Sequence, residues 1–441
     1  MEKANLLIAV FSIFFVIYLL IKRRDTKTVL VGAGVIMAIV ALNPMAALNS
    51  FASKMTTGSL IMAICSSMGF AYVMRYTKCD QHLVKLLTAP LKNVGFFLIP
   101  IAIILTFFIN IAIPSAAGCS AAVGATLIPV MMASGVKPAM AASAVLAGTF
   151  GSMLSPGTSH NAIVAGMAGV SVPQNIAGHA EYVFVSGIIA IIGVSLVALV
   201  FKDYDKNKSY EIKSKGEKKE IEKLNFLYAM MPLVPLVILI FGGIVSIYGK
   251  VWTIDGVLLK DVSWIAWTNM GVAQAMLIGS ILAILVTMTN PEKISKEFFN
   301  GMGMAYADIM GIIIAASVFV SGLDALGAIK VAIAYLQESD AVVKWGATFG
   351  PFLMAVITGS GDAAAIAFNE AVTPHAATLG YETVKLGMAA ADAGAIGRSM
   401  SPLAGAAIVC AGLAGVSPTE LFKRNAVPMI VATTYLALFM L

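Results

Sequence analysis

The chain has 441 residues, of which 59% are hydrophobic and 12% charged, and its mean hydropathy is +0.90. A soluble domain carries about a quarter charged residues, so this composition excludes an ordinary soluble enzyme. The 29 Lys and Arg outnumber the 23 Asp and Glu, but the surplus falls in short loops between apolar runs. That distribution is typical of membrane topology and not of nucleic-acid binding. The sequence predicts a multi-pass protein of a bacterial inner (plasma) membrane, with membrane lipid and no nucleic acid as a partner.

Apolar segments recur along the whole chain. They cover 5–21, 29–48, 57–74, 95–134, 139–170, 183–201, 226–248, 264–289, 303–323, 343–379, 382–416 and 425–441. They predict an all-α polytopic membrane protein with about eleven transmembrane helices plus two re-entrant hairpins. The first run is followed by Lys22-Arg23-Arg24, whereas a signal peptide carries its basic residues before the apolar run. We therefore expect a transmembrane helix there. The leucine and lysine pattern over 83–92 predicts an amphipathic surface helix.

The stretch 202–224 differs from the rest because it is rich in both lysine and acidic residues. It predicts a solvated, flexible cytoplasmic linker without chemistry of its own. The linker divides the chain into a first repeat, 1–201, and a second repeat, 225–441.

The two parts contain a repeated motif. Residues 165–171 read AGMAGVS and residues 411–417 read AGLAGVS, and a Ser-Pro pair precedes each motif at the same distance. The first copy is followed by a segment without Lys or Arg, whereas Lys423 and Arg424 follow the second. Because basic loops stay in the cytoplasm, the copies are predicted to have opposite orientations. Inverted-topology repeats are typical of secondary transporters.

Two apolar segments contain small, polar centres. The segment 95–134 has its centre at 114–120, and the segment 343–379 has its centre at 358–362. Non-helical backbone at membrane depth persists only where protein buries it or where it lines a wet cavity. We interpret both segments as re-entrant hairpins. The alternative is a plain helix pair joined by a surface loop.

Two further segments, 139–170 and 382–416, are interrupted by proline at 151–161 and 397–405. Proline removes a backbone donor and opens the helix, which exposes carbonyls to cations and N–H groups to anions. Nearby hydroxyls can complete a sodium site or donate to a carboxylate; they belong to Ser155, Thr158, Ser399 and Ser401. The alternative is a pair of kinks used only for packing.

Ionisable residues in apolar segments are costly and indicate function. Asp362 lies in the second hairpin centre, Arg398 lies beside the second break, and Asp392 lies one and a half turns earlier. The Arg398 guanidinium suits a carboxylate because it donates two parallel hydrogen bonds. A structural partnership with Asp362 or Asp392 is the alternative. His160 and Asn161 flank the first break. No HExxH, dinucleotide or Walker motif is present, so neither an enzyme nor ATP-driven transport is predicted.

These residues carry a family resemblance. The segments VITGSGDAAAIAFNEAV, ADAGAIGRSMSPLAGAAIVCAGLAGVSP and FKRNAVP resemble the anaerobic C4-dicarboxylate carrier family DcuC, part of a larger group of ion transporters. The resemblance implies a homodimer formed through scaffold helices, and an elevator-like movement of the part that bears the hairpins. One departure is Asp362, where the family form is expected to read TGSGN. That extra carboxylate could bind a cation or proton, or repel a dianion.

The resemblance also implies a site between the hairpin tips and the helix breaks. The implied substrate-binding residues are Ser115, Gly118, Ser120, Thr158, Asn161, Thr358, Gly359, Ser360, Arg398 and Ser399. The implied coupling-ion residues, which form a sodium site if the ion is Na⁺, are Ser155, Asp362 and Ser401.

The leading hypothesis is ion-coupled secondary transport of small anionic carboxylates, with succinate, fumarate or malate as the favoured substrate. The coupling ion is Na⁺ or H⁺, and no cofactor is expected. The alternatives are a sodium/proton antiporter, a passive channel, or a carrier of another acid such as a short-chain fatty acid, citrate or an amino acid.

Overall fold

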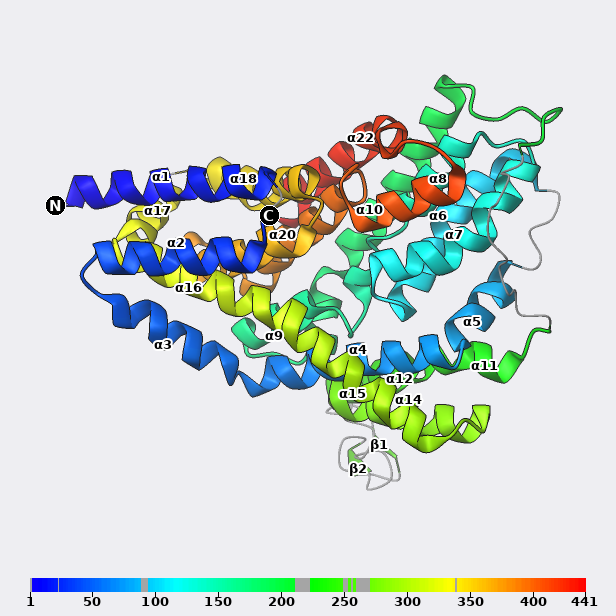
Figure 1. Ribbon diagram of the computed structural model, residues 1–441, viewed down its shortest axis with the longest axis horizontal. Coiled ribbons are helices and arrows are strands. Elements are labelled where there is room, and N and C mark those ends of the chain that lie inside the picture. Colours follow the sequence, from blue (N-terminus) through cyan, green and yellow to red (C-terminus); the bar gives the residue numbers. More distant parts are fainter. Residues whose placement is uncertain are drawn as a thin grey trace.

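The computed structural model describes residues 2–22, 24–88, 94–210, 223–248, 253–254, 257–258, 270–337 and 339–441. These residues are almost entirely helical, which confirms the predicted all-α class (Figure 1). The exception is a small antiparallel pair, β1 (Thr253–Ile254) and β2 (Val257–Leu258).

The helices of the first part are α1 (Glu2–Ile21), α2 (Thr26–Val40), α3 (Pro44–Met55), α4 (Gly58–Tyr76), α5 (Cys79–Thr88), α6 (Leu98–Ala112), α7 (Ala116–Ala133), α8 (Pro138–Ala147), α9 (Ser159–Ala168) and α10 (Val172–Val200). Those of the second part are α11 (Phe226–Met230), α12 (Val234–Tyr248), α14 (Val272–Thr287), α15 (Pro291–Ala305), α16 (Gly311–Ala325), α17 (Ala328–Gln337), α18 (Asp340–Thr358), α19 (Gly361–Ala371), α20 (Thr383–Arg398), α21 (Gly405–Ala414) and α22 (Pro418–Tyr435).

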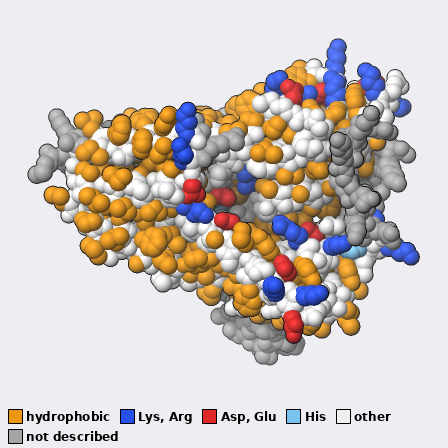
Figure 2. Space-filling view, viewed as in Figure 1, with side chains coloured by type: hydrophobic (Ala, Val, Ile, Leu, Met, Phe, Trp, Pro, Cys, Tyr) orange, Lys and Arg blue, Asp and Glu red, His pale blue; other side chains and the backbone are white. Residues whose placement is uncertain are grey.

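Within the described ranges, six helices are long and apolar enough to cross a membrane, or up to eight if each of two bent pairs is one span. Other helices also expose large apolar side chains. In α1, Leu7, Phe11 and Phe14 are each at least 67% exposed. Figure 2 shows a largely hydrophobic surface over α1, α2 and α3. Side chains of this kind are stable against lipid and not against water. The chain is therefore a membrane protein.

The first predicted hairpin is formed by α6 and α7, which pack against each other across a turn at 113–115. Ser115 caps α7, because its Oγ accepts a hydrogen bond from Gly118 N–H (3.1 Å). On α6, the buried Asn110 amide donates a hydrogen bond to the carbonyl of Ile113 and so stabilises the turn. Each arm is long enough to cross the membrane alone, so re-entrance stays a prediction.

The second predicted hairpin is formed by α18 and α19, which are joined at Gly359 and Ser360. Gly359 has φ +79°, and a Cβ there would lie 2.6 Å from the backbone of Leu403. Both the left-handed conformation and the close approach require glycine. Gly359 therefore allows the tip of hairpin two to contact the backbone of the second helix break directly.

Both proline-containing segments are broken helices. In the first, a short 3-10 helix (Gly151–Leu154) and an extended turn separate α8 from α9. In the second, residues 399–404 separate α20 from α21. The helix following each break ends at a glycine in the left-handed conformation, Gly169 and Gly415, so the repeated AGxAG motif is a pair of matching C-caps.

The buried hydrophobic residues form two main clusters. One joins α6–α8, α10, α18 and α20–α22, which we call the hairpin body. The other joins α1, α2, α4, α12 and α14–α16, which we call the scaffold body. Residues of α9 and α19 enter both clusters. Each body thus draws helices from both parts of the chain, and α9 and α19 lie at the boundary.

Within the scaffold body, α2 and α16 touch backbone to backbone. A Cβ at Gly322 would lie 2.5 Å from the carbonyl oxygen of Gly34, and one at Gly34 would lie 2.4 Å from that of Val318. Small residues permit such contacts between membrane helices.

Gly322→Ala is therefore expected to destabilise the protein by about 1–3 kcal/mol, because backbone atoms cannot move aside as a side chain can. Thermal unfolding in detergent measures the change. Gly346→Ala on α18 is the control, since a Cβ there meets nothing within 4 Å, and equal stability of both variants would refute the expectation.

Other predicted segments fare as follows. The amphipathic surface helix corresponds to α5, with residues 89–93 outside the described ranges. The apolar run 29–48 is divided by Asn43-Pro44 into α2 and the start of α3. The linker prediction for 202–224 falls mostly on residues outside the described ranges. Its beginning is packed, since Lys137 N–H donates to the Asp203 carbonyl (2.8 Å) and Asp205 N–H to that of Gly135 (2.9 Å). The division into inverted repeats stays a prediction.

Candidate functional site

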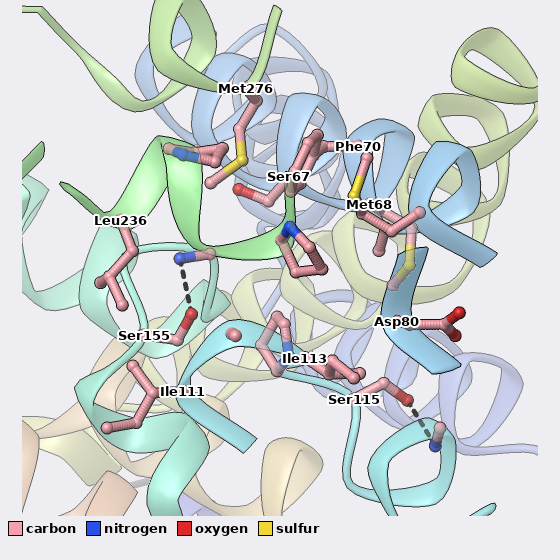
Figure 3. A pocket seen from close by; sticks show the side chains of 18 of the residues that line it. Ser67, Met68, Phe70, Asp80, Ile111, Ile113, Ser115, Ser155, Leu236 and Met276 are labelled. Atoms are coloured by element: carbon pink, nitrogen blue, oxygen red, sulfur yellow. Dashed lines mark hydrogen bonds between the residues drawn. The ribbon is translucent and has the colours of Figure 1, made fainter. Parts of the chain in front are cut away.

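The tip of hairpin one and the first break line one cavity (Figure 3). Ser115 and Ser155 contribute hydroxyls to it, and Ser67 of α4 lies across from them. The Ser155 Oγ accepts a hydrogen bond from Gly157 N–H (3.3 Å), so its own hydrogen remains available. A Cβ at Gly157 would meet Ser67 and Pro114 at 3.2–3.4 Å. The break therefore lies tightly between the hairpin tip and the scaffold body.

The tip of hairpin two lines a separate cavity. Thr358 and Ser360 face it from the hairpin and Leu403 from the second break. Arg24 faces it from the segment between α1 and α2, and Thr26 from the first turn of α2. Each tip thus shares a cavity with the break of its own part of the chain, closed on the other side by the scaffold body.

One polar contact joins the first break to the tip of hairpin two. His160, in the first turn of α9, places Nε2 2.9 Å from Oδ1 of Asp362 at the start of α19. His160 is 3% exposed, whereas the Asp362 side chain is 43% exposed. The Asp362 carboxylate therefore has one oxygen engaged, and its side chain remains partly exposed.

Arg398 is the last residue of α20 and reaches across to the first break. Its Nη2 donates to the carbonyl of Thr149 (3.1 Å), while its Nε has no protein partner. Among the described residues, neither Asp362 nor Asp392 forms an ion pair with it. The guanidinium is thus a cation at the meeting point of both breaks that still has N–H groups to donate.

Apart from Ser155, the hydroxyls predicted at the breaks, and that of Thr358 at the tip of hairpin two, donate to backbone carbonyls. Ser401 donates to the carbonyl of Val356 (2.7 Å), which ties the second break to hairpin two. Thr158 donates to the carbonyl of Ser152, and Thr358 donates to that of Met354 (2.8 Å). Ser399 lies 3.2 Å from the hydroxyl of Thr149. In this conformation such hydroxyls can meet a ligand or sodium ion only as acceptors.

Two of the predicted substrate-binding residues, Ser120 and Asn161, are fully buried. Ser120 is fully buried in α7, and its hydroxyl has no hydrogen-bond partner within the part of the chain that the structure describes. Asn161 is fully buried, and its amide donates to the carbonyls of Met153 (2.6 Å) and Ser155 (3.0 Å). Asn161 therefore stabilises the backbone conformation of the first break. Direct contact of either residue with substrate stays a prediction.

Sequence reasoning did not identify three residues near the site. Asn175 and His179 of α10 hydrogen-bond Asn161, and both precede the apolar run that predicted this helix. Arg75 lies in the last turn of α4, just beyond the apolar run 57–74, and its Nη2 lies 3.5 Å from the position of a Cβ on Gly118. A polar i, i+4 pair ahead of an apolar run was the available signal for Asn175 and His179.

Comparison with known proteins gives a consistent result. A family model described as the C4-dicarboxylate anaerobic carrier DcuC matches residues 16–441. The anaerobic C4-dicarboxylate transporter DcuC of Escherichia coli K12 is 28% identical over 384 residues, 85% of this chain and 78% of that protein. A Haemophilus influenzae transporter without an assigned substrate is 55% identical over 292 residues, 66% of this chain and all of that protein.

A solved structure shares the fold. The YdaH transporter of Alcanivorax borkumensis, described as having an unusual topology, superposes with a TM-score of 0.56 over 89% of this chain and 86% of its own, at 12% identity. At that identity the likeness concerns the fold alone.

Proposed function

The chain belongs to the DcuC family of C4-dicarboxylate anaerobic carriers, and from this premise we propose that it is an ion-coupled carrier of C4-dicarboxylates. Succinate, fumarate and malate are the proposed substrates. The protein acts in the inner membrane of a bacterium as a homodimer.

The observation that carries the proposal is the position of Arg398. It joins the two breaks while keeping N–H groups free, as described above, and its neighbours are the half-helix ends at both breaks. A guanidinium with free donors beside opened backbone suits a carboxylate better than any neutral substrate. The hairpin tips on either side would supply the hydroxyls of Ser115 and Ser360, which donate to no other group among the described residues.

The two hydrophobic bodies support an elevator-type movement. Most of the hairpins and breaks belong to the hairpin body, with α9 and α19 at the boundary, and the helices closing their cavities belong to the scaffold body. Two separately packed cores can slide past each other without either core being disrupted. In the proposed cycle the hairpin body carries the bound substrate past the scaffold body, and each cavity opens in turn.

For the coupling ion we retain Na⁺ and H⁺. A sodium ion held by Ser155, Asp362 and Ser401 would use oxygen ligands, which suit a hard cation. It would compete with His160 for the Asp362 carboxylate. A proton could instead be taken up by one of the histidine–carboxylate pairs.

The test is transport by purified protein in proteoliposomes. Vesicles loaded with unlabelled succinate are expected to take up labelled succinate by exchange, and fumarate and malate outside should compete. A sodium or proton gradient should drive accumulation above the equilibrium level. Absence of exchange with all three acids would reject the proposal.

A sodium/proton antiporter is the second candidate, favoured by the two histidine–carboxylate pairs, His160–Asp362 and His179–Asp392. The same vesicles decide between the two. An antiporter would move sodium against protons with no carboxylate present, whereas the proposed carrier is expected to move neither ion without substrate.

A further inference from the structure

A buried polar network lies behind the first break and connects the two parts of the chain. It contains Asn161 of α9, Asn175 and His179 of α10, and Asp392 of α20, none of them more than 1% exposed. His179 Nε2 lies 3.1 Å from Asn161 Oδ1, and His179 Nδ1 lies 3.1 Å from Asp392 Oδ2. Asn175 Nδ2 lies 2.9 Å from the same Asn161 oxygen.

The orientation of the Asn161 amide follows from its partners. One end of the amide faces two backbone carbonyls, of Met153 and Ser155. Carbonyl oxygens only accept hydrogen bonds, so that end must be the NH₂ group. The other end is therefore the oxygen, which can only accept. Reversing the amide would set its oxygen against two carbonyl oxygens at 2.6 and 3.0 Å.

This orientation fixes the protonation of His179. Because Asn161 Oδ1 accepts, His179 Nε2 must carry a hydrogen. A neutral imidazole has one N–H, so Nδ1 of a neutral His179 would be bare. A bare Nδ1 facing an ionised Asp392 at 3.1 Å would place two acceptors in contact. The contact becomes a hydrogen bond only when one more proton is present, on Asp392 or on Nδ1.

The burial of His179 and Asp392 also indicates that the pair holds one extra proton. Without the extra proton the pair carries a net charge of −1, and with it the pair is neutral overall. The second oxygen of Asp392, Oδ1, has no protein partner among the described residues. An unpaired buried charge inside a membrane protein is costly, so the proton-bound pair is the stable form of this conformation.

Other ionisable groups on the elements packed around α9, α10 and α20 do not replace this proton. They are Arg75, Lys137, His160, Glu181, Lys344, Asp340, Asp362, Glu370, His375, Glu382, Lys385, Arg398, Glu420, Lys423 and Arg424. Within the described ranges, none of them forms an ion pair or hydrogen bond with His179 or Asp392. Most are engaged with one another, as in the pairs His160–Asp362 and Lys344–Asp340.

We infer that His179 and Asp392 form a proton-binding site whose single proton joins the two parts of the chain and holds the first break in its present shape. On release of the proton, Asp392 and His179 repel each other. Movement of His179 then acts on Asn161, which holds the Met153 and Ser155 carbonyls. Proton occupancy is thereby linked to the geometry of the break. The coupling role rests on the proposed transport function, whereas the existence of the site does not.

Asp392→Asn is the decisive variant. An asparagine amide can donate to the bare Nδ1 of a neutral His179 and so mimics the proton-bound pair permanently. In proteoliposomes we expect this variant to retain succinate exchange and to lose accumulation driven by a pH gradient. Glu181→Gln, an exposed carboxylate two residues from His179, is the matched control and should keep both. An Asp392→Asn protein that still accumulates succinate with the pH gradient would overturn the coupling role.

A second measurement needs no transport. Above about pH 6.5 an exposed histidine and an exposed aspartate carry no proton, so the folded protein binds one proton more than the unfolded chain. Its stability must then fall as the pH rises. The thermal midpoint of the wild type in detergent should drop with rising pH, and that of Asp392→Asn should stay level. Identical pH profiles for the two proteins would overturn the site.

A third measurement covers an Asp392→Asn protein that does not fold. Nitrogen NMR of wild-type protein labelled in its four histidines should show Nε2 of His179 protonated, with the signal assigned by its loss in His179→Gln. A bare Nε2 would overturn the proton count. Should the wild type fail to exchange succinate, the proposed function fails, while the thermal and NMR results still decide the site.

Discussion

Arg398→Gln is expected to weaken succinate binding roughly 100-fold, because truncating one partner of a desolvated, hydrogen-bonded charge pair costs about 2–5 kcal/mol. The guanidinium is the charged group at the meeting of both breaks, and its N–H groups beyond the bond to Thr149 are free to donate. Glutamine keeps a donor for the Thr149 carbonyl but has no charge. Binding of labelled succinate to purified protein measures the loss.

Two further variants make this result interpretable. Arg398→Lys keeps the charge without the planar fork and should lie between the wild type and Arg398→Gln. Lys385→Gln removes a charge from the same helix, where Lys385 pairs only loosely with Glu382 (3.9 Å), and should bind as the wild type does. If Arg398→Gln has a wild-type thermal midpoint and unaltered succinate affinity, Arg398 does not bind the substrate.

The second large effect concerns stability and lies far from the hairpin tips. Arg424 of α22 donates to both carboxylate oxygens of Asp203, with Nε–Oδ2 2.7 Å and Nη2–Oδ1 3.1 Å. The Asp203 side chain is 0% exposed. Removing Arg424 leaves the buried Asp203 carboxylate with only the half-exposed Lys137 as an ion-pair partner (Nζ–Oδ1 3.4 Å), and breaking a buried ion pair costs about 3–5 kcal/mol. Arg424→Leu is therefore expected to lower the thermal midpoint sharply.

A double-mutant cycle separates the pair from its surroundings. Asp203→Leu combined with Arg424→Leu leaves no unpaired charge and should be more stable than Arg424→Leu alone. Lys423→Leu, next to Arg424 but 58% exposed, should change stability little. Equal losses for Lys423→Leu and Arg424→Leu would show that the buried pair has no special contribution.

Much of the fold could be predicted from apolar runs and from proline and glycine. The hairpins and both breaks lie where Pro114, Gly359, Pro156 and Pro402 interrupt helical sequence, because those residues act on the backbone locally. Boundaries were less accurate where hydropathy and structure disagree. Helix α10 begins at Val172, well before the apolar run that starts at 183. Hydropathy misses its first turns because they contain Asn175 and His179, which are polar although they are buried.

The sequence indicates which polar residues lie near the breaks but not how they pair. His160, Asn161, Asp362 and Arg398 were all noted as polar residues near breaks. That His160 meets Asp362, while Arg398 meets the Thr149 carbonyl, depends on contacts between residues 202 and 249 positions apart. No local pattern encodes such contacts, since they arise only when the two parts of the chain pack together.

The shared composition of the hairpin body has a consequence for biosynthesis. When α6–α10 leave the ribosome, the second part of the chain has not yet been made. The Ser143 carbonyl then lacks the Asn425 amide (3.2 Å), the Thr149 carbonyl lacks Arg398, and His179 lacks Asp392. Lipid offers such groups no hydrogen bonds. The nascent first part must therefore keep its break hydrated or shielded by the insertion machinery until α20 and α22 arrive.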